Sequence, residues 1–324
     1  RAEIRDRWGA LLPGFECAPP GHPIAVGMPA GAVTDDTEQA ILLARLLVKE
    51  HGHVDPLELA EALVRWERDM AERGSLDLLG PSTKRAVAAV LAGAPPDEAG
   101  ATGATNGAAM RITPVGIATA LTPSNPATPS NPAIPASLST LVDHVAMASS
   151  VTHNTGIALA GAAAVAAAVS AGVSGATVAQ ATALGVQAAR LAAGRGHWVA
   201  GADVAARIEW ATSLVVGRAE AEAAELIYTL VGTSLATQES VPAAFAVLAA
   251  VPDDPWQACL LAASLGGDSD TIAAMTGAVS GACHGLEAFP PEARAVIDAH
   301  GLRLAELADD LYALRSAAED NQPR

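Results

Sequence analysis

Cysteine is scarce in this sequence, and the number and spacing of the cysteines argue against disulfide bonds and against a zinc site. The chain of 324 residues has three cysteines, Cys17, Cys259 and Cys283. Their number is odd and no two have Cys-x-x-Cys spacing, so neither a disulfide framework nor a zinc knuckle is expected. No secretory signal peptide is recognised at the start of the sequence. We therefore expect a protein of the reducing cytoplasm.

Basic residues are also few. The 19 lysines and arginines are outnumbered by 35 aspartates and glutamates, which gives a formal net charge of −16. A negative surface repels a phosphate backbone, so duplex nucleic acid is not expected as a partner. The same negative field attracts divalent cations.

Long hydrophobic runs are limited to one stretch, residues 157–173. It is uncharged, but it consists mostly of alanine and glycine. At roughly 17 residues it lies at the short limit for a membrane span. We interpret it as a buried helix of a globular protein and expect no membrane partner.

Aromatic residues and strand-like alternation are both scarce. Aromatics make up 3% of the chain, whereas hydrophobic residues make up 51% and alanine is abundant. Alanine is the best helix former, and the apolar spacing predicts an all-α fold with about a dozen helices. The segments predicted to be helical start at residue 34 or 35 and at residue 56, and cover 81–91, 108–121, 137–151, 155–172, 176–193, 199–216, 219–231, 242–251, 255–265, 269–285 and 291–316. A break of the segment 108–121 at Pro114 is the alternative for that segment.

Residues 122–135 interrupt the helical pattern. They contain two Pro-Ser-Asn-Pro sequences. Prolines at this density fit neither a helix nor a strand, so the segment is predicted to be a surface loop.

Two short segments differ from ordinary core and surface, because each sets two carboxylates beside hydroxyls at the start of an apolar helix. They are Gly31-Ala32-Val33-Thr34-Asp35-Asp36-Thr37-Glu38 and Gly266-Gly267-Asp268-Ser269-Asp270-Thr271. Helix capping explains either cluster alone, since Asp, Ser and Thr favour the first turn of a helix. One carboxylate is enough for a cap, however, and a second like charge is costly unless a cation neutralises it.

The oxygens of these side chains are hard ligands suited to Mg²⁺, Mn²⁺ or Ca²⁺, and both clusters lack the histidine and cysteine of zinc sites. If the two clusters meet in space, they can hold two ions about 3.5–4 Å apart. Their spacing in the sequence does not show that they meet. Gly266 and Gly267 would let the backbone come close to a ligand.

Two weaker candidates lie between the acidic clusters. The segment Asn106-Gly107-Ala108-Ala109-Met110-Arg111 indicates a turn, with small residues that allow a substrate to come close. The segment Thr152-His153-Asn154 places a histidine at a helix start, where a lone histidine is more often structural than functional.

In the order in which they occur, these segments resemble the ADP-ribosylglycohydrolase family over residues 33–285. The matching motifs are Thr34-Asp35-Asp36-Thr37-Glu38, Gly80-Pro81-Ser82-Thr83, Asn106-Gly107-Ala108-Ala109-Met110-Arg111, His153 and Gly266-Gly267-Asp268-Ser269-Asp270-Thr271. The resemblance implies a single all-α domain over residues 1–324, a compact orthogonal bundle of many helices with a binuclear metal site at its centre.

The resemblance also implies roles for the site residues. Metal ligation is expected from Thr34, Asp35, Asp36, Asp268, Asp270 and Thr271. Asp36 and Asp270 are the candidate catalytic carboxylates that take a proton from the attacking water. Substrate contact is expected from Asn106, Gly107, Ala108, His153, Gly267 and Ser269, the last of which stands where many relatives have threonine. The expected cofactors are two Mg²⁺ ions, with Mn²⁺ as the alternative.

One feature departs from the family pattern. Its members usually open with a helix bearing Gly-Asp-x-x-Gly, followed by a glutamate near the metals. No such helix is expected before Thr34, and residues 1–31 resemble the loop that normally follows it.

The implied function is a metal-dependent hydrolase that breaks the N- or O-glycosidic bond at C1′ of a ribose in an ADP-ribosyl conjugate, including an ADP-ribosylated protein. Residues 74–79 resemble bacterial members linked to nucleoside or sugar catabolism, so a nucleoside N-ribosyl hydrolase is the alternative. A relative that only binds ADP-ribose or metal is a third alternative. A terpene synthase is disfavoured because Gln39 stands where a DDxxD motif needs aspartate.

Overall fold

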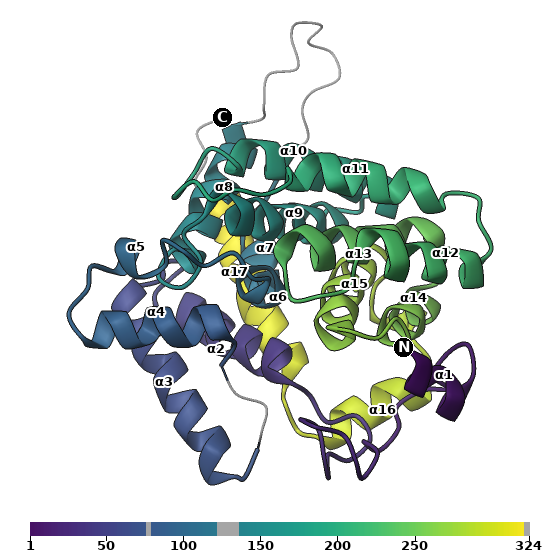
Figure 1. The fold of residues 1–324 in the computed structure, drawn as a ribbon. Coiled ribbons are helices and arrows are strands. Elements are labelled where there is room, and N and C mark those ends of the chain that lie inside the picture. Colours follow the sequence, from purple (N-terminus) through teal and green to yellow (C-terminus); the bar gives the residue numbers. More distant parts are fainter. Residues whose placement is uncertain (76–78, 122–135, 321–324) are drawn as a thin grey trace, which may run out of the picture.

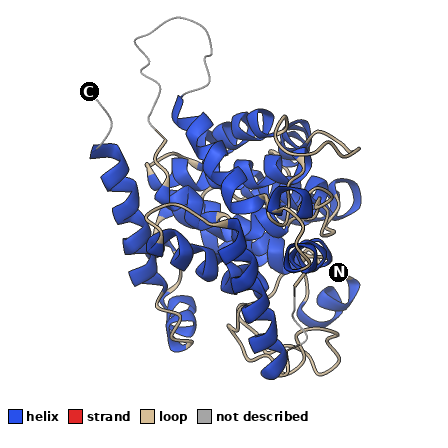
Figure 2. Ribbon diagram, turned by 90° about the vertical axis from the view of Figure 1, so that its left-hand side faces the viewer, coloured by secondary structure: helices blue, strands red, loops and turns tan. Residues whose placement is uncertain are grey.

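The structure is a computed structural model that describes residues 1–75, 79–121 and 136–320. Its described residues form helices and loops (Figures 1 and 2), with two isolated β-bridges, Thr105 with Ala236 and Thr155 with His197. The all-α prediction is confirmed for this part of the chain. The predicted surface loop at 122–135 lies outside the described residues.

The helices follow one another along the chain with short connections. Their bounds are α1 Ala2–Trp8, α2 Asp35–Lys49, α3 Pro56–Glu72, α4 Pro81–Leu91, α5 Pro96–Ala99, α6 Gly107–Arg111, α7 Thr113–Ala118, α8 Ala136–Ser149, α9 Gly156–Val173, α10 Val178–Ala192, α11 Val204–Val215, α12 Glu220–Leu226, the π-helix η1 Ile227–Val231, α13 Thr237–Ala250, α14 Pro255–Ala263, α15 Ser269–His284, the 3-10 helix η2 Leu286–Ala288, α16 Pro291–Ala299 and α17 Leu304–Asp320.

Helix α9 lies at the centre of the fold and is packed against α6, α7, α8, α10 and α15 (Figure 1). Every residue from Ile157 to Gly172 is buried. Its small side chains let neighbouring helices come close: a Cβ atom on Gly161 would lie 2.3 Å from Cγ2 of Thr237 on α13. By length and composition α9 could cross a membrane, but 94% of it is buried inside the molecule. The prediction of a buried core helix is confirmed.

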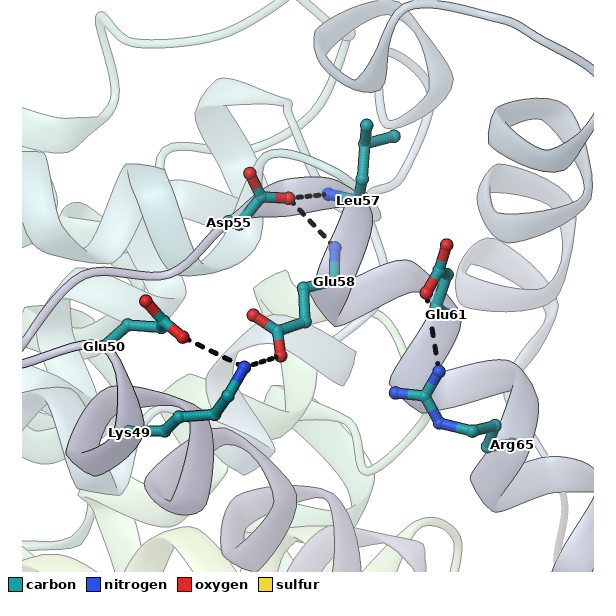
Figure 3. A network of polar contacts seen from close by, with 7 residues as sticks. All are labelled: Lys49, Glu50, Asp55, Leu57, Glu58, Glu61 and Arg65. Atoms are coloured by element: carbon teal, nitrogen blue, oxygen red, sulfur yellow. Dashed lines mark hydrogen bonds and ion pairs between the residues drawn. The ribbon is translucent and has the colours of Figure 1, made fainter.

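The junction of α2 and α3 shows how local sequence starts a helix (Figure 3). The Asp55 carboxylate accepts hydrogen bonds from the backbone N–H groups of Leu57 at 2.8 Å and Glu58 at 3.0 Å. Lys49 at the end of α2 forms ion pairs with Glu50 and Glu58 across the junction. Exposed pairs of this kind contribute about 0–1 kcal/mol, so the cap and the buried face of α3 hold the helix.

Helix α13 begins five residues earlier than the predicted start at Pro242, which lies inside the helix. Proline has no N–H group, so the carbonyl of Gln238 one turn earlier loses its usual partner. The Nε of Arg207 on α11 donates to that carbonyl instead. A tertiary hydrogen bond therefore allows the helix to include its proline.

Other segments also differ from the predicted bounds. The predicted helix 291–316 is divided into α16 and α17, with positive φ at Gly301 and Arg303. The segment 108–121 is divided, as the alternative expected, but at Ile112, because Pro114 is tolerated in the first turn of the new helix α7.

The expectation that residues 1–31 form a loop is wrong for residues 2–8, which form α1. Glu3 in its first turn and Arg5 and Arg7 in its last turn complement the helix dipole. This helix has no Gly-Asp-x-x-Gly pattern.

The fold brings three helices together that are far apart in the sequence. Helices α2, α6 and α15 each contact the other two, and they carry three of the candidate motifs (Figure 1). The N-terminal ends of α2 and α15 begin at the two acidic motifs.

Candidate metal centre

The acidic motifs start helices without capping them. Thr34 occupies the N-cap position of α2 and Asp268 that of α15, yet neither side chain makes a cap hydrogen bond. Side-chain caps are present elsewhere, at Asp55 before α3 and at Thr155 before α9. Capping therefore does not account for the hydroxyls and carboxylates of the two motifs.

Asp36 on the first turn of α2 is almost fully buried, with 1% of its surface exposed. Its Oδ2 accepts a hydrogen bond from the Thr34 hydroxyl at 2.8 Å. Its Oδ1 is buried without a hydrogen-bond partner. Burial, followed by the nearby Asp270 carboxylate, raises the pKa of Asp36 to about 7, and the hydroxyls of Thr34 and Thr271 oppose this shift.

The second motif is held by its backbone. Gly266 and Gly267 have φ values of 79° and 77°, which favour glycine. A Cβ on Gly267 would lie 2.3 Å from the carbonyl oxygen of Thr233, so this position has no room for a side chain. The backbone N–H of Asp268 donates to the same carbonyl at 2.7 Å.

Asp268 is tied to the third candidate segment. The Nδ2 of Asn106 donates to its Oδ2 at 2.5 Å and also lies 3.0 Å from the hydroxyl of Ser240. Burial raises the pKa of Asp268, the Asn106 amide lowers it, and the Asp270 carboxylate raises it. The structure thus joins Asn106 directly to the second acidic motif.

The two acidic motifs meet. Asp36 of α2 experiences the charges of both Asp270 and Asp268, and helices α2 and α15 are in contact. The Asp36 carboxylate interacts electrostatically with Asp270 and Asp268 and lies beside the hydroxyls of Thr34 and Thr271, and one of its buried oxygens has no hydrogen-bond partner. This set of hard oxygen atoms fits a divalent cation, which would neutralise the like charges.

The expected binuclear centre is not shown. Within residues 1–75, 79–121 and 136–320, no three side chains of His, Cys, Asp or Glu are placed to hold one ion together. Asp270 is exposed, whereas Asp35 and Asp268 are half-buried. Metal ligation by the six predicted residues remains a prediction.

The predicted substrate residues lie in different surroundings. Gly267 is exposed and Ser269 is half-buried beside the second motif. Ala108 is 1% exposed and packs in the hydrophobic core. His153 is fully buried, and Gly107 packs so closely on it that a Cβ would lie 2.8 Å from its Cε1. In this structure the side chains of Ala108 and His153 are therefore not accessible to a ligand.

Sequence reasoning gave no role to several polar residues behind the motifs, although two of them, Arg111 and Thr152, lie within its candidate segments. Gln39 and Arg111 are fully buried and hydrogen-bond each other at 3.0 Å. Thr105 and Thr152 lie on either side of the His153 ring, 2.9 Å and 2.8 Å from its nitrogens. A polar residue inside an apolar helical pattern, as at Gln39 four residues after Asp35, is the signal that could have identified this set.

Comparisons with known proteins identify the family of the chain. The ADP-ribosylglycohydrolase family model matches residues 1–321. The uncharacterized protein YegU of Escherichia coli K12 is 36% identical over 267 residues, which cover 82% of this chain and 75% of YegU. An uncharacterized protein of Archaeoglobus fulgidus is 29% identical over 255 residues, 78% of this chain and 72% of that protein.

A solved structure has the same fold. It is described as an ADP-ribosylglycohydrolase-related protein complex and superposes with a TM-score of 0.64. Its sequence is 24% identical, and the match covers 96% of this chain and 94% of the other. The all-α bundle is therefore the ADP-ribosylglycohydrolase fold, and the chain belongs to the ADP-ribosylglycohydrolase family.

Proposed function

We propose that this protein is a Mg²⁺-dependent hydrolase that cleaves the N- or O-glycosidic bond at C1′ of the ribose in an ADP-ribosyl conjugate. Its family consists mostly of hydrolases, acts on ADP-ribosyl substrates in general and is often metal-dependent. The free state of its three cysteines supports the proposed location in the cytoplasm.

One observation carries the proposal. Asp36 is buried beside the carboxylates of Asp268 and Asp270, and its Oδ1 has no hydrogen-bond partner. A fold keeps such a costly arrangement when a cation or a reaction uses it. The residues that would hold two Mg²⁺ or Mn²⁺ ions are Thr34, Asp35, Asp36, Asp268, Asp270 and Thr271.

A bound divalent cation supplies Lewis-acid charge and lowers the pKa of the water that it holds. The protein's own residues supply the rest of the chemistry. Asp36 and the exposed Asp270 are the two candidate carboxylates that would accept a proton from the attacking water. The clustered carboxylates stabilise positive charge that develops on the sugar as the bond at C1′ breaks.

The substrate would enter at the exposed side of the second motif. Gly267, which has no side chain, and the half-buried Ser269 flank the acidic cluster there. The Asn106 amide donates to the Asp268 carboxylate and orients it. Asn106 would therefore both hold this carboxylate and contact the substrate. Gly107, Ala108 and His153 would act from behind this surface.

The test measures Mg²⁺ binding and turnover in the same variants. Asp35→Ala and Asp270→Ala should abolish Mg²⁺ binding in calorimetry, and they should abolish release of ADP-ribose from ADP-ribosyl-arginine and ADP-ribosyl-serine in mass spectrometry. The matched control is Asp309→Ala, which removes an exposed carboxylate of α17 and should change neither result. Unchanged Mg²⁺ affinity in both site variants would defeat the proposal.

The same measurement separates the alternatives. Release of ribose from nucleosides, with ADP-ribosyl conjugates left intact, would favour a nucleoside N-ribosyl hydrolase. Binding of ADP-ribose or Mg²⁺ without any turnover would favour a non-catalytic relative.

A further inference from the structure

A buried chain of hydrogen bonds begins at the first acidic motif. The Nε2 of Gln39 donates to the Asp35 Oδ2 at 3.1 Å, one turn apart on α2. The other end of the same carboxamide, Oε1, accepts from the Nη1 of Arg111 on α6 at 3.0 Å. Gln39 thus bridges the Asp35 carboxylate and the Arg111 guanidinium.

The chain continues beyond α6. The Nη2 of Arg111 donates to the hydroxyl of Thr152, which follows α8. That hydroxyl lies 2.8 Å from the Nδ1 of His153, and the Nε2 of His153 lies 2.9 Å from the hydroxyl of Thr105. Whichever nitrogen of the ring carries the proton, each has a hydroxyl partner that can donate or accept.

The chain ends at the second acidic motif. Thr105 is bonded in sequence to Asn106, and the Asn106 amide donates to the Asp268 carboxylate at 2.5 Å. The path from Asp35 to Asp268 therefore consists of side-chain hydrogen bonds with a single backbone link, between Thr105 and Asn106.

Burial makes this path rigid. Gln39, Arg111, Thr152 and His153 are each 0% exposed. A buried polar group that leaves its partner is not compensated by water, so each side chain is confined to its bonded position. Asp35 also provides a negative charge toward the buried Arg111 guanidinium. A burial-lowered pKa keeps His153 neutral, with one ring nitrogen donating and the other accepting.

From this geometry we infer that Gln39, Arg111, Thr152 and His153 are positioning residues that fix the two acidic motifs relative to each other before any ligand binds. Two backbone hydrogen bonds hold the Asp268 end of the path in place. The Asn106 N–H donates to the Leu235 carbonyl at 3.0 Å, and the Asp268 N–H to the Thr233 carbonyl at 2.7 Å. The consequence for ion binding rests on the proposed function, whereas the coupling of the motifs does not.

The test uses a matched pair of substitutions at the middle of the path. Thr152→Val keeps the shape but removes the hydroxyl that Arg111 and His153 share, and Thr152→Ser keeps the hydroxyl. In the metal-free protein, Thr152→Val should speed hydrogen exchange about tenfold at both residues 34–39 and the Asp268 amide. Thr152→Ser should keep the wild-type rates at both.

Metal affinity provides the second measurement. Thr152→Val should weaken Mg²⁺ binding about 10–100-fold in calorimetry, the usual effect of losing a residue that orients metal ligands. Thr152→Ser should retain the wild-type affinity. This rescue by a hydroxyl separates positioning from a general loss of packing.

Two further variants keep the outcome clear. If Thr152→Val fails to fold, Gln39→Met breaks the path at its first bridge and should give the same exchange at both motifs. Thr212→Val makes the same substitution on α11, where the hydroxyl donates to the carbonyls of Ile208 and Glu209 in its own helix, and should leave exchange at both motifs unchanged.

Wild-type exchange at the Asp268 amide in both Thr152→Val and Gln39→Met would overturn the inference. The failure of the proposed function would appear differently. If the proposed function is wrong, Asp270→Ala binds Mg²⁺ as the wild type does. Hydrogen exchange in Thr152→Val and Gln39→Met would still decide whether the path couples the two motifs.

Discussion

At the scale of single residues, Asp36 links burial to protonation. Its pKa of about 7 results first from burial and then from the neighbouring Asp270 carboxylate. The same carboxyl in an unfolded chain has a pKa of about 3.8. Folding therefore raises its affinity for a proton, and near neutral pH the folded protein must either protonate this carboxyl or keep a buried charge.

This shift predicts how the stability of the metal-free protein depends on pH. The folded state binds more protons than the unfolded state between about pH 4 and pH 7, so the free energy of unfolding falls as pH rises through this window. The loss is on the order of a few kcal/mol above pH 7 and is absent below pH 4. Asp36→Asn should flatten this dependence and be more stable than the wild type at pH 8.

Urea unfolding with a metal chelator at pH 5, 6, 7 and 8 measures the effect. The control is Asp309→Asn, an exposed carboxylate on α17, which should keep the wild-type slope. The burial-raised pKa of Asp268 acts in the same direction, so some slope should remain in Asp36→Asn. An unchanged slope in Asp36→Asn would show that this carboxyl is not the cause.

At the scale of helices, α9 depends on small residues rather than on large apolar ones. Residues 157–172 are all buried, and α10 and α13 approach it closely. On α10, Gly185 faces α9, where a Cβ would lie 2.8 Å from the carbonyl oxygen of Ala164. Close packing of this kind leaves little room for added atoms.

Gly161→Val tests this close packing. A Cβ at this position would lie 2.3 Å from Cγ2 of Thr237, so the valine must displace α13. We expect a loss of about 1–3 kcal/mol in the free energy of unfolding. Gly194→Val is the control, because its Cβ would meet no atom within 4 Å, and it should change stability by about 0.5 kcal/mol or less. Equal effects in thermal or urea unfolding would contradict the packing argument.

At the scale of the whole molecule, the last helix packs against elements from the first part of the chain. Helix α17 contacts α2 and α7, and it lies behind α6 in Figure 1. Arg315 is 3% exposed, and its Nη1 donates to the Thr119 carbonyl at 2.9 Å and lies 3.1 Å from the Ser170 hydroxyl. One guanidinium thus joins α17 to the C-terminal ends of α7 and α9.

Arg315→Met should lower the free energy of unfolding by roughly 3 kcal/mol, because buried oxygens lose a charged donor. Urea unfolding and limited proteolysis of α17 measure this loss. Arg303→Met is the control, since Arg303 pairs with Glu306 on the surface of the same region. Similar stability in the two variants would show that Arg315 does not anchor the helix.

The site was only partly predictable from the sequence. The motif residues 34–38 and 266–271 combine like charges, hydroxyls and glycines at helix starts, and this local chemistry is visible without coordinates. Gln39 and Arg111 were given no role, although Arg111 lies in a motif that carries the family resemblance, because burial and hydrogen-bond partners are properties of the folded chain. His153 was expected to contact substrate, yet the fold surrounds it with Thr105 and Thr152.

The sequence by itself determined the helical class, the buried nature of α9 and the starts of α2, α4 and α15, because alanine content, apolar spacing and the residue types of a first helical turn act over a few residues. Only the tertiary structure decided that the two acidic motifs meet, that a buried hydrogen-bond chain joins them, and that Pro242 lies inside a helix. These features depend on contacts between residues far apart in the chain, and local propensity carries no information about such contacts.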